Sequence, residues 1–275
     1  MKFTFDQDFH IHSRLSACSD DPAQSPESIL RYGEENNLKQ LVLTDHFWDE
    51  NVPMGHYPDA PVPGAPEWYM PQNYAHICAA RPLPQSEKCQ FLFGCETEMD
   101  KYGTIGVSRE RMEEMDFFIV PTTHLHMDGF TYAPADGVTA EGRRKLWTER
   151  LEHLLSLDLP FRKMGVAHLA CGLIAPKREM TLAVLAGLPE ADMKRLFQKA
   201  AKLGIGIELN SDDMKFKDEE ADIVLRPFRA AKEAGCLFYC GSDAHHPENF
   251  DRVGDIFRRA IDYLELDETQ KFKLS

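Results

Sequence analysis

Two histidines separated by one residue, His10 and His12, lie in the first apolar segment of the chain, and Asp8 precedes them by two positions. Successive side chains of a β-strand point to opposite faces, so in an extended segment these three residues would share one face. Two imidazoles placed in this way can bind one divalent cation, and Asp8 could orient one ring by accepting its hydrogen bond. Such a pair is weak evidence by itself, and its weight depends on further ligands.

Side chains that bind metals also stand at the ends of the later apolar segments. They are Asp45, His46, Glu96, His124, His126, His168, Glu208, Asn210, Asp243, His245 and His246. The carboxyl ends of parallel strands in a closed barrel lie on one face, where the active sites of such barrels are built. Residues far apart in the sequence would therefore meet in one cavity.

The chemistry of this set favours divalent metals. Carboxylates buried together with neutral imidazoles would leave uncompensated negative charge, which is costly in a protein interior. Histidine, aspartate and glutamate ligands without thiolates suit zinc, manganese or iron, and a carboxylate shared by two ions is the usual way to hold them close together. We therefore expect a cluster of divalent ions at this site.

Short apolar runs alternate with amphipathic stretches over almost the whole chain, which is typical of strand and helix units around a parallel sheet. The predicted strands are residues 3–12, 40–46, 90–97, 117–124, 163–170, 205–210 and 237–243. We predict one helix that Ser25 caps with Pro26 in its first turn, and others at about 139–157, 190–203 and 219–234. Gly204 and Gly235 would end the last two of these helices.

Two long segments interrupt this alternation. Residues 47–72 contain six prolines and several aromatic residues, and residues 126–138 follow the fourth predicted strand. A loop of this length after a strand is usually functional. The aromatic side chains Trp48, Tyr57, Trp68 and Tyr69 could cover a bound substrate, or could simply cover apolar surface. Since no other segment resembles a linker, we expect residues 1–275 to form one catalytic barrel domain with an irregular insertion at about 47–72.

Composition and charge narrow the class of protein. The 275 residues are 43% hydrophobic and 28% charged, which allows a well-buried core and excludes disordered, collagen-like and coiled-coil chains. The formal net charge of -14 weighs against non-specific binding to nucleic acid or anionic membranes. No apolar run suits a membrane helix, the N-terminus is unlike a secretory signal, and the seven cysteines are too scattered for a disulfide framework. We therefore expect a cytoplasmic protein.

The order of these motifs resembles that of the polymerase and histidinol phosphatase (PHP) superfamily of metal-dependent phosphoesterases. The resemblance rests on Asp8-x-His10-x-His12-Ser13, Thr44-Asp45-His46, Gly94-x-Glu96, the separate His124 and His168, and Gly241-Ser242-Asp243-Ala244-His245. These motifs span residues 8–245, which is nearly the whole chain. The resemblance implies an α/β fold, a distorted TIM-like (β/α)7 barrel, with two or three divalent metal ions.

The resemblance also implies which side chains bind the ions. The eight implied ligands are His10, His12, His46, Glu96, His124, His168, Asp243 and His245. Glu96 would bridge the ion of the His-x-His pair and Asp243 to a second ion bound by His124 and His168. The third ion, near His46 and His245, often has a further histidine in the family. This chain has Cys18 there, followed by Asp20, so either a thiolate or a carboxylate could complete that site.

By this resemblance the protein would hydrolyse a small phosphomonoester, and the similarity to the histidinol-phosphate phosphatase branch makes L-histidinol phosphate the first substrate to test. A water that bridges two cations loses a proton near neutral pH and can attack phosphorus without a covalent enzyme intermediate. We expect Glu96 and Asp243 to act in catalysis, although Asp45 or a histidine could also take the proton. Lys177 and Arg178, in the loop after the fifth predicted strand, are candidate contacts for the phosphate.

Other functions fit parts of the pattern. A phosphodiesterase or nuclease is the near alternative, although the acidic charge and the lack of an appended nucleic-acid-binding module weigh against it. A metal-dependent amidohydrolase also begins with His-x-His on a barrel strand, but it usually lacks the Gly-Ser-Asp-Ala-His ending. A non-catalytic barrel that binds a phosphorylated ligand would hold metals without turnover. The sequence contains no phosphate loop, dinucleotide fingerprint, serine nucleophile elbow or zincin motif.

Overall fold

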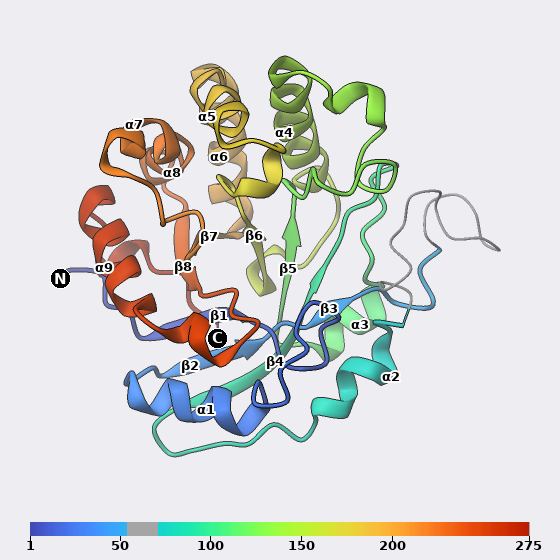
Figure 1. The fold of residues 1–275 in the computed structure, drawn as a ribbon, viewed down its shortest axis with the longest axis vertical. Coiled ribbons are helices and arrows are strands. Elements are labelled where there is room, and N and C mark those ends of the chain that lie inside the picture. The colour runs from blue at the N-terminus through green and yellow to red at the C-terminus, as the bar shows by residue number, and fades with distance from the viewer. Residues whose placement is uncertain (54–70, 275) are drawn as a thin grey trace.

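The centre of the molecule is a set of short strands that pair in parallel (Figure 1). The structure, a computed structural model, describes residues 1–53 and 71–274. Its strands are β1 (Gln7–Ile11), β2 (Gln40–Leu43), β3 (His46–Phe47), β4 (Gln90–Thr97), β5 (Phe117–Pro121), β6 (Met164–Ala167), β7 (Gly206–Asn210) and β8 (Leu237–Gly241). Most of their residues are buried, as expected for parallel strands that are covered on both faces.

The strands close into a distorted barrel. Their hydrogen-bonded order is β1-β2-β4-β5-β6-β7-β8, and β3 pairs with β4 beyond the end of β2. Backbone hydrogen bonds join the first and last strands at their carboxyl ends, where Asp243 N donates to His10 O at 2.7 Å and His12 N donates to Ala244 O at 3.0 Å. The predicted (β/α)7 barrel is therefore confirmed, with β2 and β3 together replacing one predicted strand.

The second predicted strand, 40–46, is interrupted where two polar side chains turn toward the segment after β1. The Thr44 hydroxyl accepts a hydrogen bond from Ile11 N at 3.0 Å. The Asp45 carboxylate accepts two from Ser13, one from its backbone N–H and one from its hydroxyl, both at 2.7 Å. Because these side chains bind the neighbouring segment, the strand ladder stops and restarts at His46, which begins β3.

Aromatic side chains fill the barrel interior away from the carboxyl ends of the strands. The Phe9 ring centroid lies 5.5 Å from that of Phe117 and 6.0 Å from that of Tyr239. The Tyr239 ring fits because Gly165 has no side chain, and a Cβ at that position would lie 2.4 Å from the ring. Phe272, near the C-terminus, belongs to the same cluster. This apolar core fills one part of the barrel and leaves the opposite part to polar residues.

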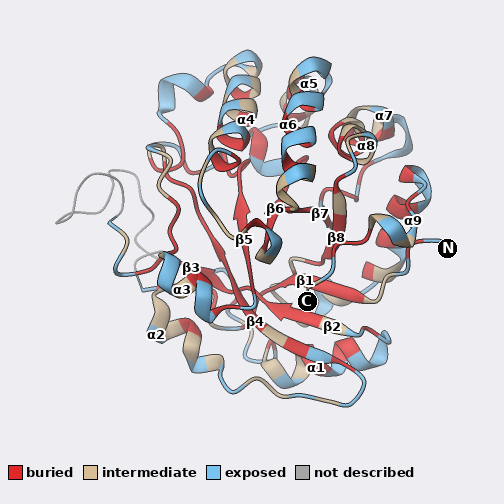
Figure 2. Cartoon of the chain, turned by 180° about the vertical axis from the view of Figure 1, so that it is seen from behind, coloured by how far each residue is buried: buried red, intermediate tan, exposed pale blue. Residues whose placement is uncertain are grey.

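Helices surround the barrel, with buried faces toward the strands and exposed faces outward (Figure 2). They are α1 (Pro26–Glu35), α2 (Tyr74–Ile77), α3 (Arg109–Glu114), α4 (Ala140–Leu154), α5 (Arg178–Ala186), α6 (Glu190–Leu203), α7 (Ala221–Val224), α8 (Arg226–Glu233) and α9 (Val253–Leu264). No helix in the described part of the chain combines the length and the apolar character needed to cross a membrane.

The helix boundaries agree with the sequence where a cap or stop residue is present. The Ser25 side chain accepts a hydrogen bond from Ser28 N at the start of α1, and α6 ends at Gly204, whose φ is 79°. The predicted helix at 219–234 is instead divided into α7 and α8 at Leu225. Pro227 lacks the N–H that would continue the first helix, which accounts for the division.

Much of the predicted insertion at 47–72 lies outside the described residues. This applies to Tyr57, Trp68 and Tyr69, whose proposed covering role therefore stays a prediction. Trp48 is described and is buried against Phe130, with the ring centroids 5.6 Å apart. In the second long segment, residues 134–137 form a short 3-10 helix that precedes α4.

Candidate metal centre

His10 reaches the barrel interior because β1 is irregular. The pairing register with β2 shifts between Asp8 and Ile11, which marks a bulge. Phe9 packs in the aromatic core, and the next residue, His10, also points inward toward Glu208. Asp8 and Ile11 face α1 instead. The expectation that Asp8 shares a face with His10 and orients a ring is therefore wrong, and its carboxylate bonds to backbone N–H groups.

Four histidines have their Nδ1 atom occupied by an acceptor. The pairs are His10 with Glu208 Oε1 (2.6 Å), His124 with Glu98 Oε1 (2.5 Å), His12 with Ser16 Oγ (2.9 Å) and His245 with the backbone oxygen of Asp243 (2.8 Å). Ser16 donates its own hydrogen to Asp45, so its oxygen accepts from the His12 ring. A neutral imidazole that donates from Nδ1 carries a bare lone pair on Nε2. Each of these rings can therefore present Nε2 to a metal.

The first group of ligand atoms forms around the His-x-His pair. The Nε2 atoms of His10 and His12 lie 3.0 Å apart. Glu96 Oε2 lies 3.4 Å from each, and Asp243 Oδ1 lies 3.3 Å from the first and 3.2 Å from the second. Two bare nitrogens facing each other beside two carboxylates repel unless a proton or a cation lies between them. The donor set fits a divalent cation that replaces the proton.

A second group uses the other oxygen of the same glutamate. Glu96 Oε1 lies 3.4 Å from His168 Nε2 and 3.9 Å from His124 Nε2. Both Glu96 Oε1 and His124 Nε2 are buried and have no hydrogen-bond partner among the described residues. Buried polar atoms without partners are rare and need an explanation. A cation between these atoms would satisfy them, and Glu96 would then bridge two ions.

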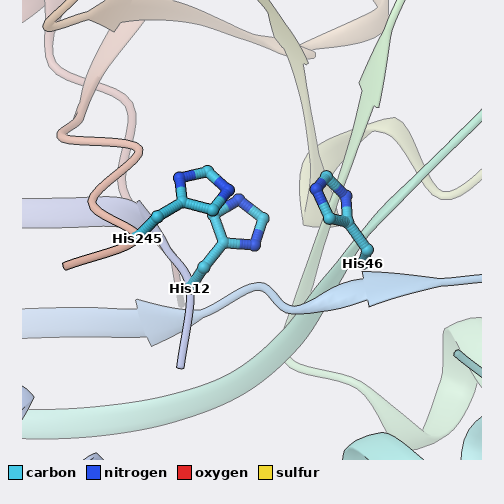
Figure 3. A group of neighbouring side chains, drawn as sticks. All are labelled: His12, His46 and His245. Carbon is cyan, nitrogen blue, oxygen red and sulfur yellow. The ribbon is translucent and has the colours of Figure 1, made fainter. Parts of the chain in front are cut away.

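A third group lies at the outer side of the first. The His12 and His245 rings stack with centroids 4.1 Å apart, and His46 faces them from the start of β3 (Figure 3). The three rings offer nitrogen atoms within 4.8 Å of one another. Cys18 Sγ lies 3.1 Å from His46 Nε2 and lines the same cavity, whereas the exposed Asp20 does not. The structure therefore brings Cys18, and not Asp20, to this group.

Two of the candidate ligands have an unusual backbone conformation. The φ angle is 61° at His168 and 54° at Asp243, in the left-handed region that non-glycine residues seldom adopt. Such a conformation costs on the order of 1–3 kcal/mol and persists where the surrounding structure enforces it. The Asp243 backbone N–H donates to His10 O at 2.7 Å, so this conformation is fixed against β1. Strain of this kind is typical of functional positions.

The pKa values reflect the charges of the cluster. Burial opposes the charged form of His10, yet the carboxylates of Asp243 and Glu208 raise its pKa well above the usual value. Burial likewise opposes ionisation of Glu96, but His10 and His46 hold its pKa well below the usual range. Protons on the imidazoles would thus offset the buried carboxylates in the absence of metal. Divalent cations can supply the same positive charge.

The three groups open into one small cavity of about 200 Å³. It is lined by Cys18, His46, Glu96, Glu98, His124, His126, Met127, His168, Leu173, Asp243 and His245. Lys177 and Arg178 do not line it. Arg178 forms an ion pair with Glu220 at 2.7 Å, and Lys177 is exposed just before α5. The structure thus brings the predicted metal ligands together but does not place the predicted phosphate contacts among them.

Two carboxylates orient ligand rings of the site. Glu208 lies inside the barrel, where Oε1 binds the His10 ring and Oε2 accepts from His168 N at 3.1 Å. Glu98 supports the site in the same way, because its Oε1 binds the His124 ring at 2.5 Å. An acidic residue within an otherwise apolar strand was the available signal for Glu208.

Comparisons with known proteins identify the family and support the fold. No curated protein matches the sequence. Among solved structures, the chain is similar to histidinol phosphate phosphatase from Lactococcus lactis subsp. lactis Il1403, a complex with zinc, L-histidinol and phosphate. The TM-score is 0.58 at 14% identity, over 98% of this chain and 99% of that one, which is a likeness of fold. The model of the PHP domain family matches residues 8–212. This match confirms the resemblance found in the sequence, and the chain belongs to the PHP domain family.

Proposed function

We propose that the protein is a metal-dependent phosphatase that hydrolyses a small phosphomonoester. The observation that carries this proposal is the position of Glu96, whose two oxygens face two separate groups of imidazole nitrogens. A buried carboxylate in this position is suited to join two ions, and paired ions are a common arrangement for phosphoryl transfer to water. Membership of the PHP domain family supports the same class of activity.

Asp243 has a different role from Glu96 at such a centre. Ions bound there would lower the pKa of a water and offset charge on the phosphoryl oxygens. Asp243 also faces both groups, because Oδ1 lies 3.3 Å from His10 Nε2 and Oδ2 lies 3.6 Å from His168 Nε2. Its side chain is 15% exposed, compared with 1% for Glu96. Asp243 therefore borders the cavity, which supports the proposal that it takes a proton from the attacking water.

The size of the cavity favours a small substrate. A volume of about 200 Å³ accommodates a phosphoryl group and a short part of the leaving group. Met127 and Leu173 provide apolar lining, and Lys177, in the loop that continues from Leu173, is the cation we retain as a candidate contact for the substrate. L-Histidinol phosphate is the first monoester to test, because the similar structure contains L-histidinol and phosphate.

The decisive experiment measures bound metal and phosphate release together. Elemental analysis of the purified protein should find divalent metal, and a panel of monoesters should release phosphate faster than matched diesters. His10→Ala and Asp243→Asn should lower both the metal content and the rate of phosphate release. His153→Ala is the matched control, because the ring of His153 lies outside the cavity and bonds to Gly103 O at 3.0 Å. A protein without bound metal, or one that acts on diesters alone, would contradict the proposal.

A further inference from the structure

Helix α4 carries three buried donors on one face, at Arg143, Trp147 and Arg150, which we call the α4 donor face. Their spacing of four and three residues places them on one side of the helix. Neither arginine forms an ion pair with a carboxylate among the residues described. Fully buried guanidinium groups are uncommon and need partners for their five N–H donors. Apart from the Tyr132 hydroxyl, which accepts from Arg143 Nη2 at 3.2 Å, the partners of this face among the described residues are backbone oxygens.

Arg150 joins the segments that follow β4 and β5. Its Nη2 donates to Met99 O at 2.8 Å, and its Nε donates to Thr122 O at 2.9 Å. It also donates to Thr131 O, and the Thr131 hydroxyl in turn donates to His124 O at 2.6 Å. One guanidinium thus sets the β4 segment, which carries Glu96 and Glu98, against the β5 segment, which carries His124.

The other two donors join the segments that follow β5 and β6. Arg143 Nη1 donates to Leu125 O at 2.8 Å and to Ile174 O at 2.5 Å. Trp147 Nε1 donates to Leu169 O at 3.0 Å. Leu125 follows His124 in the chain, and Leu169 follows His168. These bonds therefore hold the backbone beside both histidines of the second ligand group.

We propose that the α4 donor face positions the second metal site, formed by Glu96, His124 and His168. Glu96 lies in β4, and His124 and His168 follow β5 and β6; the donor face joins the three segments that follow these strands. The first group shares Glu96 but takes its other ligands from β1, β8 and the residues just after them, and among the described residues the donor face makes no hydrogen bond to those segments. The inference rests on the proposed function, because it requires that the protein binds more than one ion.

The test replaces each arginine by lysine and measures the two sites separately. Lysine keeps a positive charge but loses the fork of donors that reaches several carbonyls at once. In Arg150→Lys and Arg143→Lys we expect zinc affinity at the second site to fall roughly 10 to 100-fold, as for other groups that orient metal ligands. Zinc at the first site should be retained. Zinc titration gives the affinities, and anomalous diffraction at the zinc edge gives the occupancy of each site.

Controls separate positioning from general stability. Arg144→Lys, on the same helix, changes a half-buried arginine that bonds to Ala183 O in α5 and should leave both sites filled. Leu151→Ala removes a fully buried side chain of α4 and should destabilise the fold while both sites still bind zinc. Trp147→Phe removes the N–H together with part of a fully buried indole, so it is compared with Leu151→Ala, which also leaves a void, and it should weaken the second site alone. It provides the test if either lysine variant fails to fold.

The outcomes distinguish this inference from the proposed function. Wild-type protein that binds no zinc at either site would overturn the proposed function. Wild-type protein with both sites filled, together with arginine variants of equal occupancy, would overturn only the positioning role. Loss of the second ion in Leu151→Ala as well would also overturn it, because any destabilisation of α4 would then suffice.

Discussion

Glu208→Gln provides a sharp test of how the metal ligands are oriented. The Glu208 carboxylate receives two donors, the His10 ring at 2.6 Å and the backbone N–H of His168 at 3.1 Å. A carboxylate can accept both, but an amide has one oxygen and one NH2 group. In the glutamine variant, one donor must therefore face another donor. Leaving a buried donor unpaired costs about 1–3 kcal/mol.

The His10 ring can avoid this conflict only by moving its hydrogen. If its Nδ1 accepts from the amide of the new glutamine, the hydrogen moves to Nε2, which is the atom that would bind metal. We therefore expect Glu208→Gln to lower metal affinity roughly 10 to 100-fold, which corresponds to about 1.4–2.7 kcal/mol. Calorimetric titration with zinc measures the affinity, and phosphate release should fall with it at limiting metal.

Glu98→Gln is the matched comparison. Glu98 receives one ring donor, from His124, and its Oε2 has no hydrogen-bond partner among the described residues. A glutamine there can turn its oxygen to the ring without placing two donors together, so its effect on metal affinity should be clearly smaller. Equal losses of metal affinity in the two variants, or wild-type affinity in Glu208→Gln, would show that the His10 tautomer does not control metal binding.

Three further predictions follow from the same geometry. Glu96→Gln should remove more bound metal than His46→Ala in elemental analysis, because Glu96 faces two ligand groups and His46 borders one. Gly241→Ala should destabilise the protein by about 1–3 kcal/mol in denaturant unfolding and weaken metal binding, since its Cβ would lie 2.0 Å from Glu208 Oε1. The pH dependence of folding stability should differ between the metal-free and the metal-bound protein. In the metal-free protein the raised pKa of His10 stabilises the fold below the usual value of 6.5, and this contribution is lost as pH rises through the folded-state pKa. Thermal unfolding at about pH 6 and about pH 9 should therefore show an alkaline loss in the metal-free protein that bound metal removes.

The barrel could be predicted because each strand carries a local signal. An apolar run such as 117–121 predicts a strand without reference to the rest of the chain. Ser25 and Gly204 likewise predict helix ends from single residues. The break in the second predicted strand depends on Asp45 meeting Ser13, and that contact exists only after β1 and β2 have paired. Helices as short as α2 and α3 contain too few turns for a periodic pattern.

In the candidate site, too, some residues could be predicted from local signals and others could not. Histidine and carboxylate ligands at strand ends could be predicted from residue type and from the rule that such ends converge. The groups that orient them could not, because each reaches its partner across the barrel. Glu208 lies 198 residues from His10 in the chain, and Ser16 connects His12 to Asp45 through a single hydroxyl. These contacts depend on the register between strands, which cannot be predicted from the residues of any one segment.

The bulge in β1 explains how one strand serves both the core and the metal centre. In a regular strand, side chains alternate, so either Phe9 or His10 could point inward, but not both. With Phe9 outward, the aromatic core would lose a ring that packs against Tyr239. With His10 outward, the first ligand group would lose its contact with Glu208 and Asp243. The shift of register between Asp8 and Ile11 removes this conflict, so packing and metal binding both depend on the irregularity and not on the His-x-His spacing alone.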